Sequence, residues 1–131
     1  MPAMMMAHES DPKTEILSKV GNLEHVEVFH NQILVATYVR PHRTKSGIYL
    51  SDKTVDEDKY QGKVGLVLKM GPQAFVSDEK TDFHGFKVEV GDWIFYRPSD
   101  GWPTTINSVD CRMFDNEFLI RGRISSPDAV W

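Results

Sequence analysis

The sequence predicts an all-β domain of the small-barrel class. Three dense runs of β-forming residues, over 33–39, 62–69 and 93–96, carry apolar side chains with a period of two. Shorter runs of the same kind follow toward the C-terminus, and little of the chain has helical periodicity. Many short strands separated by turn residues are typical of small β-barrels.

The bulk composition indicates one soluble domain with no nucleic-acid partner. The chain has 131 residues, of which 40% are hydrophobic, and a net charge of −4. Nucleic-acid binding usually requires a basic surface, which this charge balance does not favour. The single cysteine, Cys111, excludes an internal disulfide and a cysteine-based zinc cluster, and it fits a reducing compartment. We therefore expect a cytoplasmic protein.

Residues 1–25 are expected to form a largely flexible N-terminal extension. Residues 1–7 are rich in methionine but lack the length and basic flank of a signal peptide or a membrane span. A short helix is predicted from Asp11 to Val20, with Ser10 or Asp11 as its cap and Gly21 at its end.

The first two strands have distinct patterns. The run 33–39 is apolar on both faces, which predicts a strand covered on both sides, and Pro41 ends it. In the run 62–69 one face is apolar, and Gly65 would permit a close approach of the backbone. The apolar residues of that face are Val64, Leu66 and Leu68.

Two long connections interrupt the strand pattern. The first, 41–61, holds the apolar tripeptide Ile48-Tyr49-Leu50 in polar surroundings and is longer than most structureless loops. It is interpreted either as an exposed loop with one residue tucked onto the core, or as a mobile arm with an apolar hook for a partner. The second, 71–87, has phenylalanines on both sides of a polar tip and fits a projecting β-hairpin or a plain surface loop.

The remaining β candidates lie after the third run. They cover 104–106, 111–114 and 117–124, and residues 125–131 form a C-terminal tail. The aromatic residues of the third run, Trp93, Phe95 and Tyr96, are expected in the core or in a subunit interface, whereas Trp102 in a turn is expected to be exposed.

No motif for catalysis, metal binding or cofactor binding is present in the sequence. The five histidines form no tight metal-binding pair, and the glycines follow no nucleotide-binding spacing. His42, Ser46 and Asp52 could be combined into a triad, but they lie in a stretch without the rigid support that catalytic groups need. The acidic run 56–58 lacks the ligand spacing of a calcium loop. We predict a protein that is not an enzyme, with no metal and no cofactor.

Five motifs, in order and at compatible spacing, resemble the GroES-type co-chaperonins. The resemblance covers about residues 29–124. The motifs are His30-Asn31-Gln32-Ile33-Leu34-Val35, Thr44-Lys45-Ser46-Gly47-Ile48-Tyr49-Leu50, Gln61-Gly62-Lys63-Val64, Val88-Glu89-Val90-Gly91-Asp92-Trp93-Ile94-Phe95 and Phe118-Leu119-Ile120.

The resemblance implies a GroES-like β-barrel over 26–124, with a mobile loop at 41–61 and a roof β-hairpin at 71–87. It implies a homo-oligomer, expected to be a heptamer, that caps a nucleotide-bound chaperonin ring and encloses client proteins in a folding chamber. The chaperonin-binding residues would be Gly47, Ile48, Tyr49 and Leu50. We predict that oligomerisation uses the strand edges near Leu34 and Phe118, because unpaired edges are templates for pairing.

Several features depart from the family pattern. The loop has the single Gly47 where the family usually has two glycines, residues 1–25 form an unusual extension, the connection before the third run is long, and the C-terminal end differs. Such departures resemble a divergent member, for example a phage-encoded one that acts in the host cytoplasm.

Two alternatives remain open. A structural or assembly protein could use the same barrel, with no chaperonin binding and with the loop tied to its own subunit. A fragment of a medium-chain alcohol dehydrogenase would need Cys/His zinc ligands and a dinucleotide-binding half, and the sequence has neither.

Overall fold

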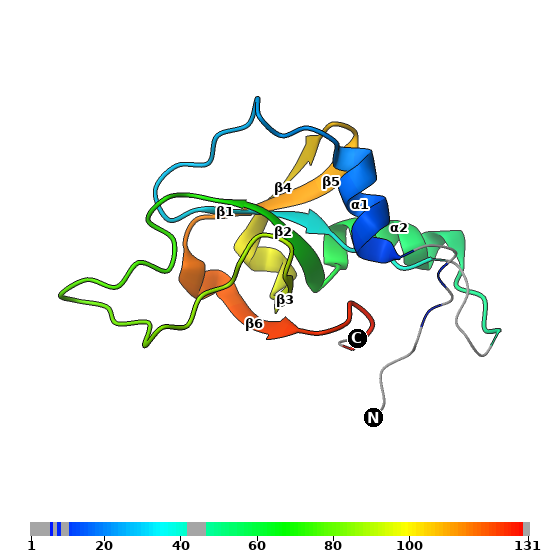
Figure 1. Cartoon of the computed structure of the whole chain (residues 1–131). Helices are drawn as coiled ribbons and strands as arrows, with labels where there is room; N and C mark the ends of the chain where they lie inside the picture. Colours follow the sequence, from blue (N-terminus) through cyan, green and yellow to red (C-terminus); the bar gives the residue numbers. More distant parts are fainter. Residues whose placement is uncertain (1–5, 7, 9–10, 42–46, 130–131) are drawn as a thin grey trace.

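A computed structural model describes residues 6, 8, 11–41 and 47–129 and confirms the all-β prediction. Within these residues, six strands form one antiparallel sheet in the order β4-β5-β1-β2-β3-β6 (Figure 1). The strands are β1 (Ile33–Thr37), β2 (Val64–Met70), β3 (Trp93–Tyr96), β4 (Gly101–Ile106), β5 (Val109–Phe114) and β6 (Ile120–Ile124). The other elements are the helices α1 (Pro12–Val20) and α2 (Asp52–Gln61) and the 3-10 turns η1 (Pro98–Asp100) and η2 (Glu117–Leu119).

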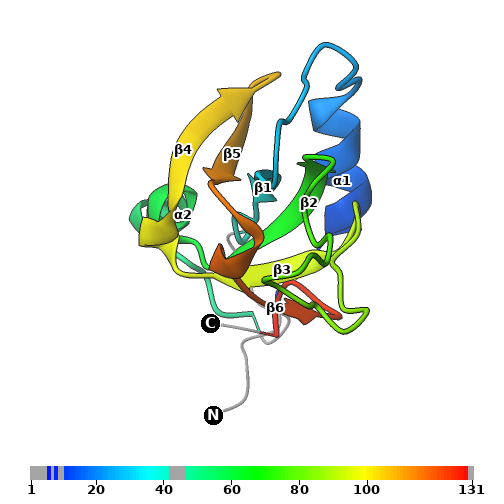
Figure 2. The same ribbon diagram turned by 90° about the vertical axis from the view of Figure 1, so that its left-hand side faces the viewer.

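The sheet is strongly curved. In Figure 2, β3 runs almost crosswise to β4 and β5, so the sheet curls toward a barrel. The strand register shifts between Leu34 and Val35 in β1 and between Phe95 and Tyr96 in β3. Such irregularities bend a strand and increase its twist, which gives the sheet its curl.

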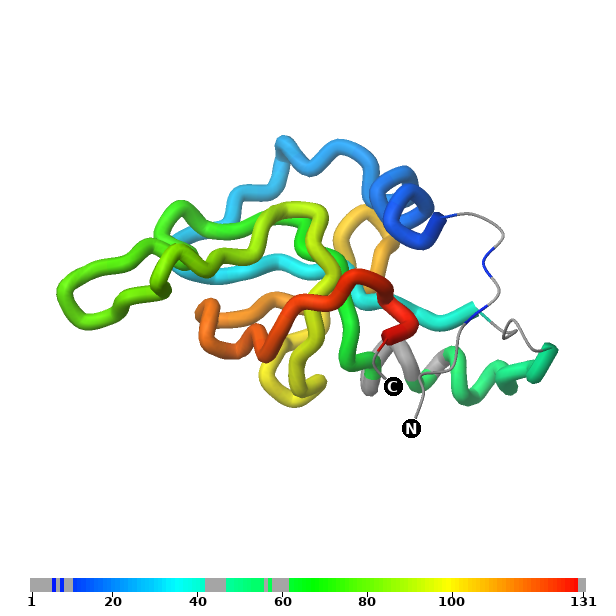
Figure 3. Tube along the Cα trace, turned by 60° about the horizontal axis from the view of Figure 1, so that its bottom comes forward, coloured from blue at the N-terminus to red at the C-terminus, as the bar shows by residue number. Residues whose placement is uncertain are grey.

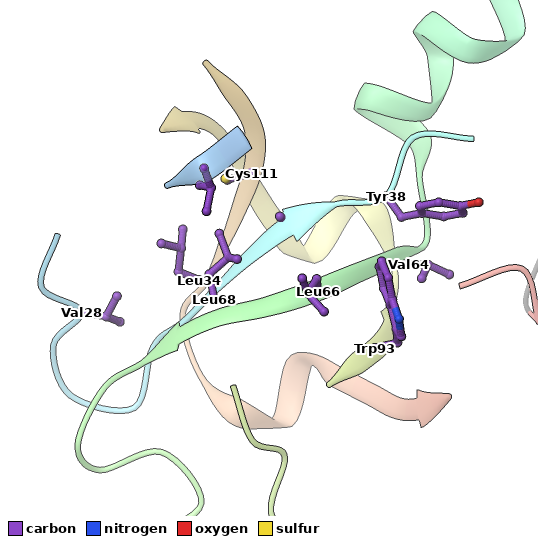
Figure 4. Close-up of a cluster of buried hydrophobic side chains, with 10 residues drawn as sticks. Val28, Leu34, Tyr38, Val64, Leu66, Leu68, Trp93 and Cys111 are labelled. Atoms are coloured by element: carbon purple, nitrogen blue, oxygen red, sulfur yellow. The ribbon is translucent and has the colours of Figure 1, made fainter. Parts of the chain in front are cut away.

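Both faces of the central strand β1 are buried, as its sequence predicts. All five residues of β1 are buried. One face, shown in Figure 4, carries Leu34, Tyr38, Leu66 and Trp93 and is covered by α1 and the segment that follows it. The opposite face holds a second cluster inside the curl, made by Ile33, Val35, Val67, Val88, Ile94, Tyr96 and Phe114. The period of two in the sequence therefore separates two distinct cores.

Gly65 allows β1 and β2 to pack closely, as predicted. A Cβ atom at this position would lie 2.2 Å from Val35 Cγ1 and 2.8 Å from the carbonyl oxygen of Ala36. Both distances are shorter than real Cβ contacts, so any side chain here would displace β1.

The N-terminal helix forms close to where the sequence places it. The side chain of Asp11 accepts a hydrogen bond from the main-chain N–H of Thr14 at 3.1 Å, which caps α1, and Gly21 follows its last turn with φ of 62°. Val20 is 1% exposed and packs in the first core cluster. The Asn107 side chain, in the turn between β4 and β5, donates a hydrogen bond to the carbonyl of Val20 at 2.6 Å and fixes the helix end.

The connection between β2 and β3 projects from the sheet, at the left of Figure 1, but it is not the predicted β-hairpin. The structure describes this connection completely, and it contains no strand between Met70 and Trp93. At its tip, Asp78 Oδ1 accepts from the main-chain N–H groups of Lys80 and Thr81, and Asp82 Oδ1 accepts from that of His84, each at 2.8 Å. These aspartate side chains occupy main-chain N–H groups that would otherwise form hydrogen bonds between the two strands of a hairpin.

Candidate functional site

The apolar tripeptide is divided between an exposed and a buried part. Ile48 and Tyr49 are 56% and 63% exposed, whereas Leu50 is 9% exposed. The preceding Gly47 has φ of 92°, a left-handed conformation that favours glycine. The structure thus presents two large apolar side chains to solvent and holds the third against the protein. Residues 44–46 of the same motif lie outside the described part of the chain.

A helix occupies the second half of the connection that the sequence predicts to be a mobile loop. α2 begins directly after Ser51, whose hydroxyl accepts a hydrogen bond from the main-chain N–H of Thr54 at 3.2 Å. Ser51 therefore caps the helix, and Asp52 in the first turn complements its dipole. The tripeptide is therefore followed, after Ser51, by a helix that lies within the predicted mobile loop 41–61 (Figure 3).

The structure corrects one of the two predicted subunit contacts. Leu34 is 0% exposed, and its strand, β1, is paired on both sides, with β2 and with β5. It offers neither a side chain nor a free edge to another subunit. The prediction failed because the sequence does not reveal that the first strand becomes a central one.

The second predicted contact, Phe118, lies on the surface. Its side chain is 60% exposed and precedes β6, which forms one edge of the sheet. Its ring stacks on Phe83 with centroids 5.6 Å apart, and Phe83 in turn packs edge-on against Phe75 at the same distance. These aromatic contacts attach the projecting connection to the region before β6.

The edge beside Phe118 also has a concave surface. A cavity of about 340 Å³ lies between the projecting connection and β6. Its lining combines apolar residues with three cations and consists of Phe75, Phe86, Lys87, Val88, Ile120, Arg121, Gly122 and Arg123.

The predicted catalytic and metal-binding candidates can be compared with the described part of the chain. Within it, no three His, Cys, Asp or Glu residues come together as metal ligands. Of the three residues that could be combined into a triad from the sequence, His42 and Ser46 lie outside the described residues, and Asp52 lies in the first turn of α2.

Shifted pKa values in the described residues follow from packing and local ion pairs. Burial raises the pKa of Tyr96 to about 12 and that of Cys111 to about 11. The hydrogen bonds from Arg97 to Asp100, both 3.0 Å long, lower the pKa of that partly buried carboxyl group. These groups lie in the core or on a turn.

The sequence interpretation missed one polar cluster, at the chain ends. Asp128 in the C-terminal tail is 2% exposed and contacts His8 and Tyr38. No local pattern could indicate it, because its members are separated by 90 residues or more in sequence from Asp128.

The fold defines a small all-β protein built on one strongly curved antiparallel sheet. The family model described as the chaperonin 10 kDa subunit (Cpn10) matches residues 25–120, well over half of the chain. The chain therefore belongs to the chaperonin 10 kDa subunit family. This membership gives it a general co-chaperonin role, with a chaperonin as partner and with oligomerisation.

No curated protein matches the chain. Among the described residues, no helix has the length and apolar character needed to cross a membrane.

Proposed function

We propose that this protein forms a ring, expected to be a heptamer, that caps a nucleotide-bound chaperonin ring and encloses client proteins during folding. Membership of the chaperonin 10 kDa subunit family carries this proposal. The proposed contact segment is Gly47, Ile48, Tyr49 and Leu50, and the exposure of Ile48 and Tyr49 supports it. The proposed compartment is the cytoplasm, that of the host if the gene is carried by a phage.

The three residues of the tripeptide differ in how much binding free energy their burial by a partner can contribute. Complete burial of a large apolar side chain contributes roughly 1.5–3 kcal/mol. Ile48 is about half exposed, so roughly half of that gain, about 1 kcal/mol, remains for a partner. Leu50 is already buried and gains little from transfer to another protein. Ile48 and Tyr49 therefore carry the proposed contact, and Leu50 positions them.

Binding through one such segment is weak because ordering each residue costs about 1–2 kcal/mol. The residues of α2 already have a helical backbone, so they add little to that cost. Several segments on one ring raise the effective concentration of each, so the assembled protein binds well while each contact stays reversible. A lid that must leave the chamber again suits such weak, repeated contacts.

For the ring itself, we propose the β6 edge and Phe118 as subunit contacts. β6 pairs only with β3 among the described strands, and Phe118 is 60% exposed. An open strand edge next to an exposed aromatic ring is a suitable surface for a second copy.

One observation favours the alternative, a structural or assembly protein without chaperonin binding. That alternative requires a loop held by its own subunit, and the burial of Leu50 agrees with such a contact. The two functions differ in whether Ile48 and Tyr49 bind a chaperonin.

Native mass spectrometry of the protein alone, and then with a chaperonin ring with and without nucleotide, tests the proposal. We expect a heptamer that joins the ring only with nucleotide, and Ile48→Asp with Tyr49→Asp should abolish the complex and preserve the heptamer. Val90→Asp is the matched control, because Val90 is equally exposed, at 58%, on another part of the surface. A heptamer that never joins the ring would support the assembly function.

A further inference from the structure

The C-terminal tail contains a carboxylate that joins three distant parts of the chain. Asp128 Oδ1 accepts a hydrogen bond from the Tyr38 hydroxyl at 2.6 Å. Its Oδ2 accepts one from the main-chain N–H of Met6 at 3.2 Å and lies 3.0 Å from His8 Nε2. The same His8 nitrogen lies 3.2 Å from the Tyr38 hydroxyl. We call Met6, His8, Tyr38 and Asp128 the tail cluster.

Three of the four residues in the tail cluster are buried, and the side chain of His8 is 21% exposed. Asp128 is 2% exposed, Tyr38 is 2% exposed and Met6 is fully buried. A buried carboxylate is tolerated only when hydrogen bonds or a charged partner replace its hydration. Asp128 has such partners on both oxygens, which indicates a specific contact between the two chain ends.

Tyr38 connects this cluster to the sheet. Its ring belongs to the core and packs edge-on against Trp93, with centroids 5.6 Å apart. Its hydroxyl points away from that core toward the tails (Figure 4). The main-chain N–H of Tyr38 also donates to the carbonyl of Val64 at 2.9 Å, so the residue itself is firmly held.

The cluster lies where the segment with the exposed tripeptide leaves the sheet. Tyr38 directly follows β1, and the chain continues through Pro41 to Gly47 and the tripeptide. Met6 and Tyr49 each take part in an isolated β-bridge, so both the N-terminal tail and the tripeptide have local strand pairing. Leu50, next to Tyr49, is buried.

We propose that Asp128 is a latch that fastens both chain ends onto Tyr38 and thereby restrains the tripeptide segment. Met6, His8 and Asp128 all lie outside residues 25–120, the part that matches the family model. Three of the four residues of the tail cluster thus come from the parts of this chain that the family model does not cover, and Tyr38 comes from the matched part. Opening it frees the N-terminal tail and increases the mobility of Gly47–Leu50 together.

Hydrogen exchange measured by mass spectrometry on the full-length protein tests the latch. Asp128→Ala removes the acceptor, Tyr38→Phe removes only the hydroxyl, and Asp115→Asn is a charge-matched control at an exposed turn. Hydrogen bonds to a buried charge are strong enough that their loss should speed exchange about ten- to a hundredfold in the opened segments. We expect this acceleration at residues 6–8 and 47–50 in both latch variants, with β2 unchanged, and no effect of Asp115→Asn.

Two outcomes would overturn the proposal. The first is a looser C-terminal tail in Asp128→Ala with unchanged exchange at 47–50. The second is additive acceleration in the Asp128→Ala, Tyr38→Phe double variant, because two partners of one latch should give no more effect together than singly. If Asp128→Ala also loosens β2, deletion of residues 1–8 provides the decisive comparison: unchanged exchange at 47–50 in that variant also contradicts the latch.

Discussion

Replacement of Gly65 by alanine should destabilise the protein although it adds a single methyl group. Two opposing effects decide whether the free energy of unfolding rises or falls. Alanine reduces the entropy of the unfolded chain, which would stabilise the protein by about 0.4–1 kcal/mol. Against this, the new Cβ would lie 2.2 Å from Val35 Cγ1 and 2.8 Å from the carbonyl oxygen of Ala36.

The steric effect should dominate because one of the two obstacles is backbone. Overpacking a dense core costs about 1–3 kcal/mol. The carbonyl of Ala36 belongs to β1, which pairs with β2 and β5 and cannot move alone. The upper part of that range is therefore expected, with a net loss near 2 kcal/mol after the entropic gain. This corresponds to a fall in melting temperature of roughly 6–10 °C.

Urea unfolding followed by tryptophan fluorescence, at one fixed protein concentration, measures this loss. The midpoint should fall while the slope stays constant, since the surface exposed on unfolding does not change. Thr105→Ala, at an exposed position in the outer strand β4, is the control and should change stability by less than about 1 kcal/mol.

A double-mutant cycle identifies the clashing atom. Val35→Ala alone should cost about 2–3 kcal/mol, because it removes two buried methyl groups and leaves a cavity. It also removes the atom nearest to the new Cβ. The double variant should then be more stable than the sum of the single effects by at least about 0.5 kcal/mol. A Gly65→Ala protein as stable as the unchanged one would refute the close-packing argument.

Three further predictions follow from the core and from α2. Burial raises the pKa of Tyr96 to about 12, so the folded protein keeps a proton that an unfolded tyrosine, with a pKa near 10, releases. The free energy of unfolding should therefore fall by up to about 2–3 kcal/mol between pH 10 and 12, and an equal fall in Tyr96→Phe would contradict this. Burial also raises the pKa of Cys111 to about 11, so a thiol reagent at pH 8 should react with the protein only in denaturant, and rapid native labelling would contradict the buried position. Ser51→Ala removes the cap of α2, and loss of about 1 kcal/mol should speed amide exchange in the helix about fivefold, whereas unchanged exchange would show that the cap is not needed.

The sequence reveals the strands better than the segments between them. The runs that became β1, β2 and β3 show a period of two, and burial on alternate faces enforces that pattern. The helix α2 was not predicted because its ten residues are mostly polar and lack an apolar stripe. The one available signal for a helix start was Ser51 followed by Asp52. The β-hairpin prediction failed because aspartate side chains bind the backbone at the tip of the β2–β3 connection.

The candidate site could also be predicted only in part. The sequence identified Ile48 and Tyr49 as apolar residues in polar surroundings, and they are exposed. It could not show that Leu50 is buried or that Leu34 lies in a central strand, because both depend on contacts made after folding. It could not reveal the tail cluster either, since Asp128 and His8 are 120 residues apart.

The proposed latch and the proposed contact segment have a joint thermodynamic consequence. If the latch restrains the segment that binds the chaperonin, opening the latch and binding the partner favour each other. Linkage then requires reciprocity: a variant such as Tyr38→Phe that opens the latch raises the affinity, and the partner, once bound, loosens the tails by the same factor. The family-matched barrel would provide the ring and the contact segment, while the two ends of the chain would set how readily that segment is released.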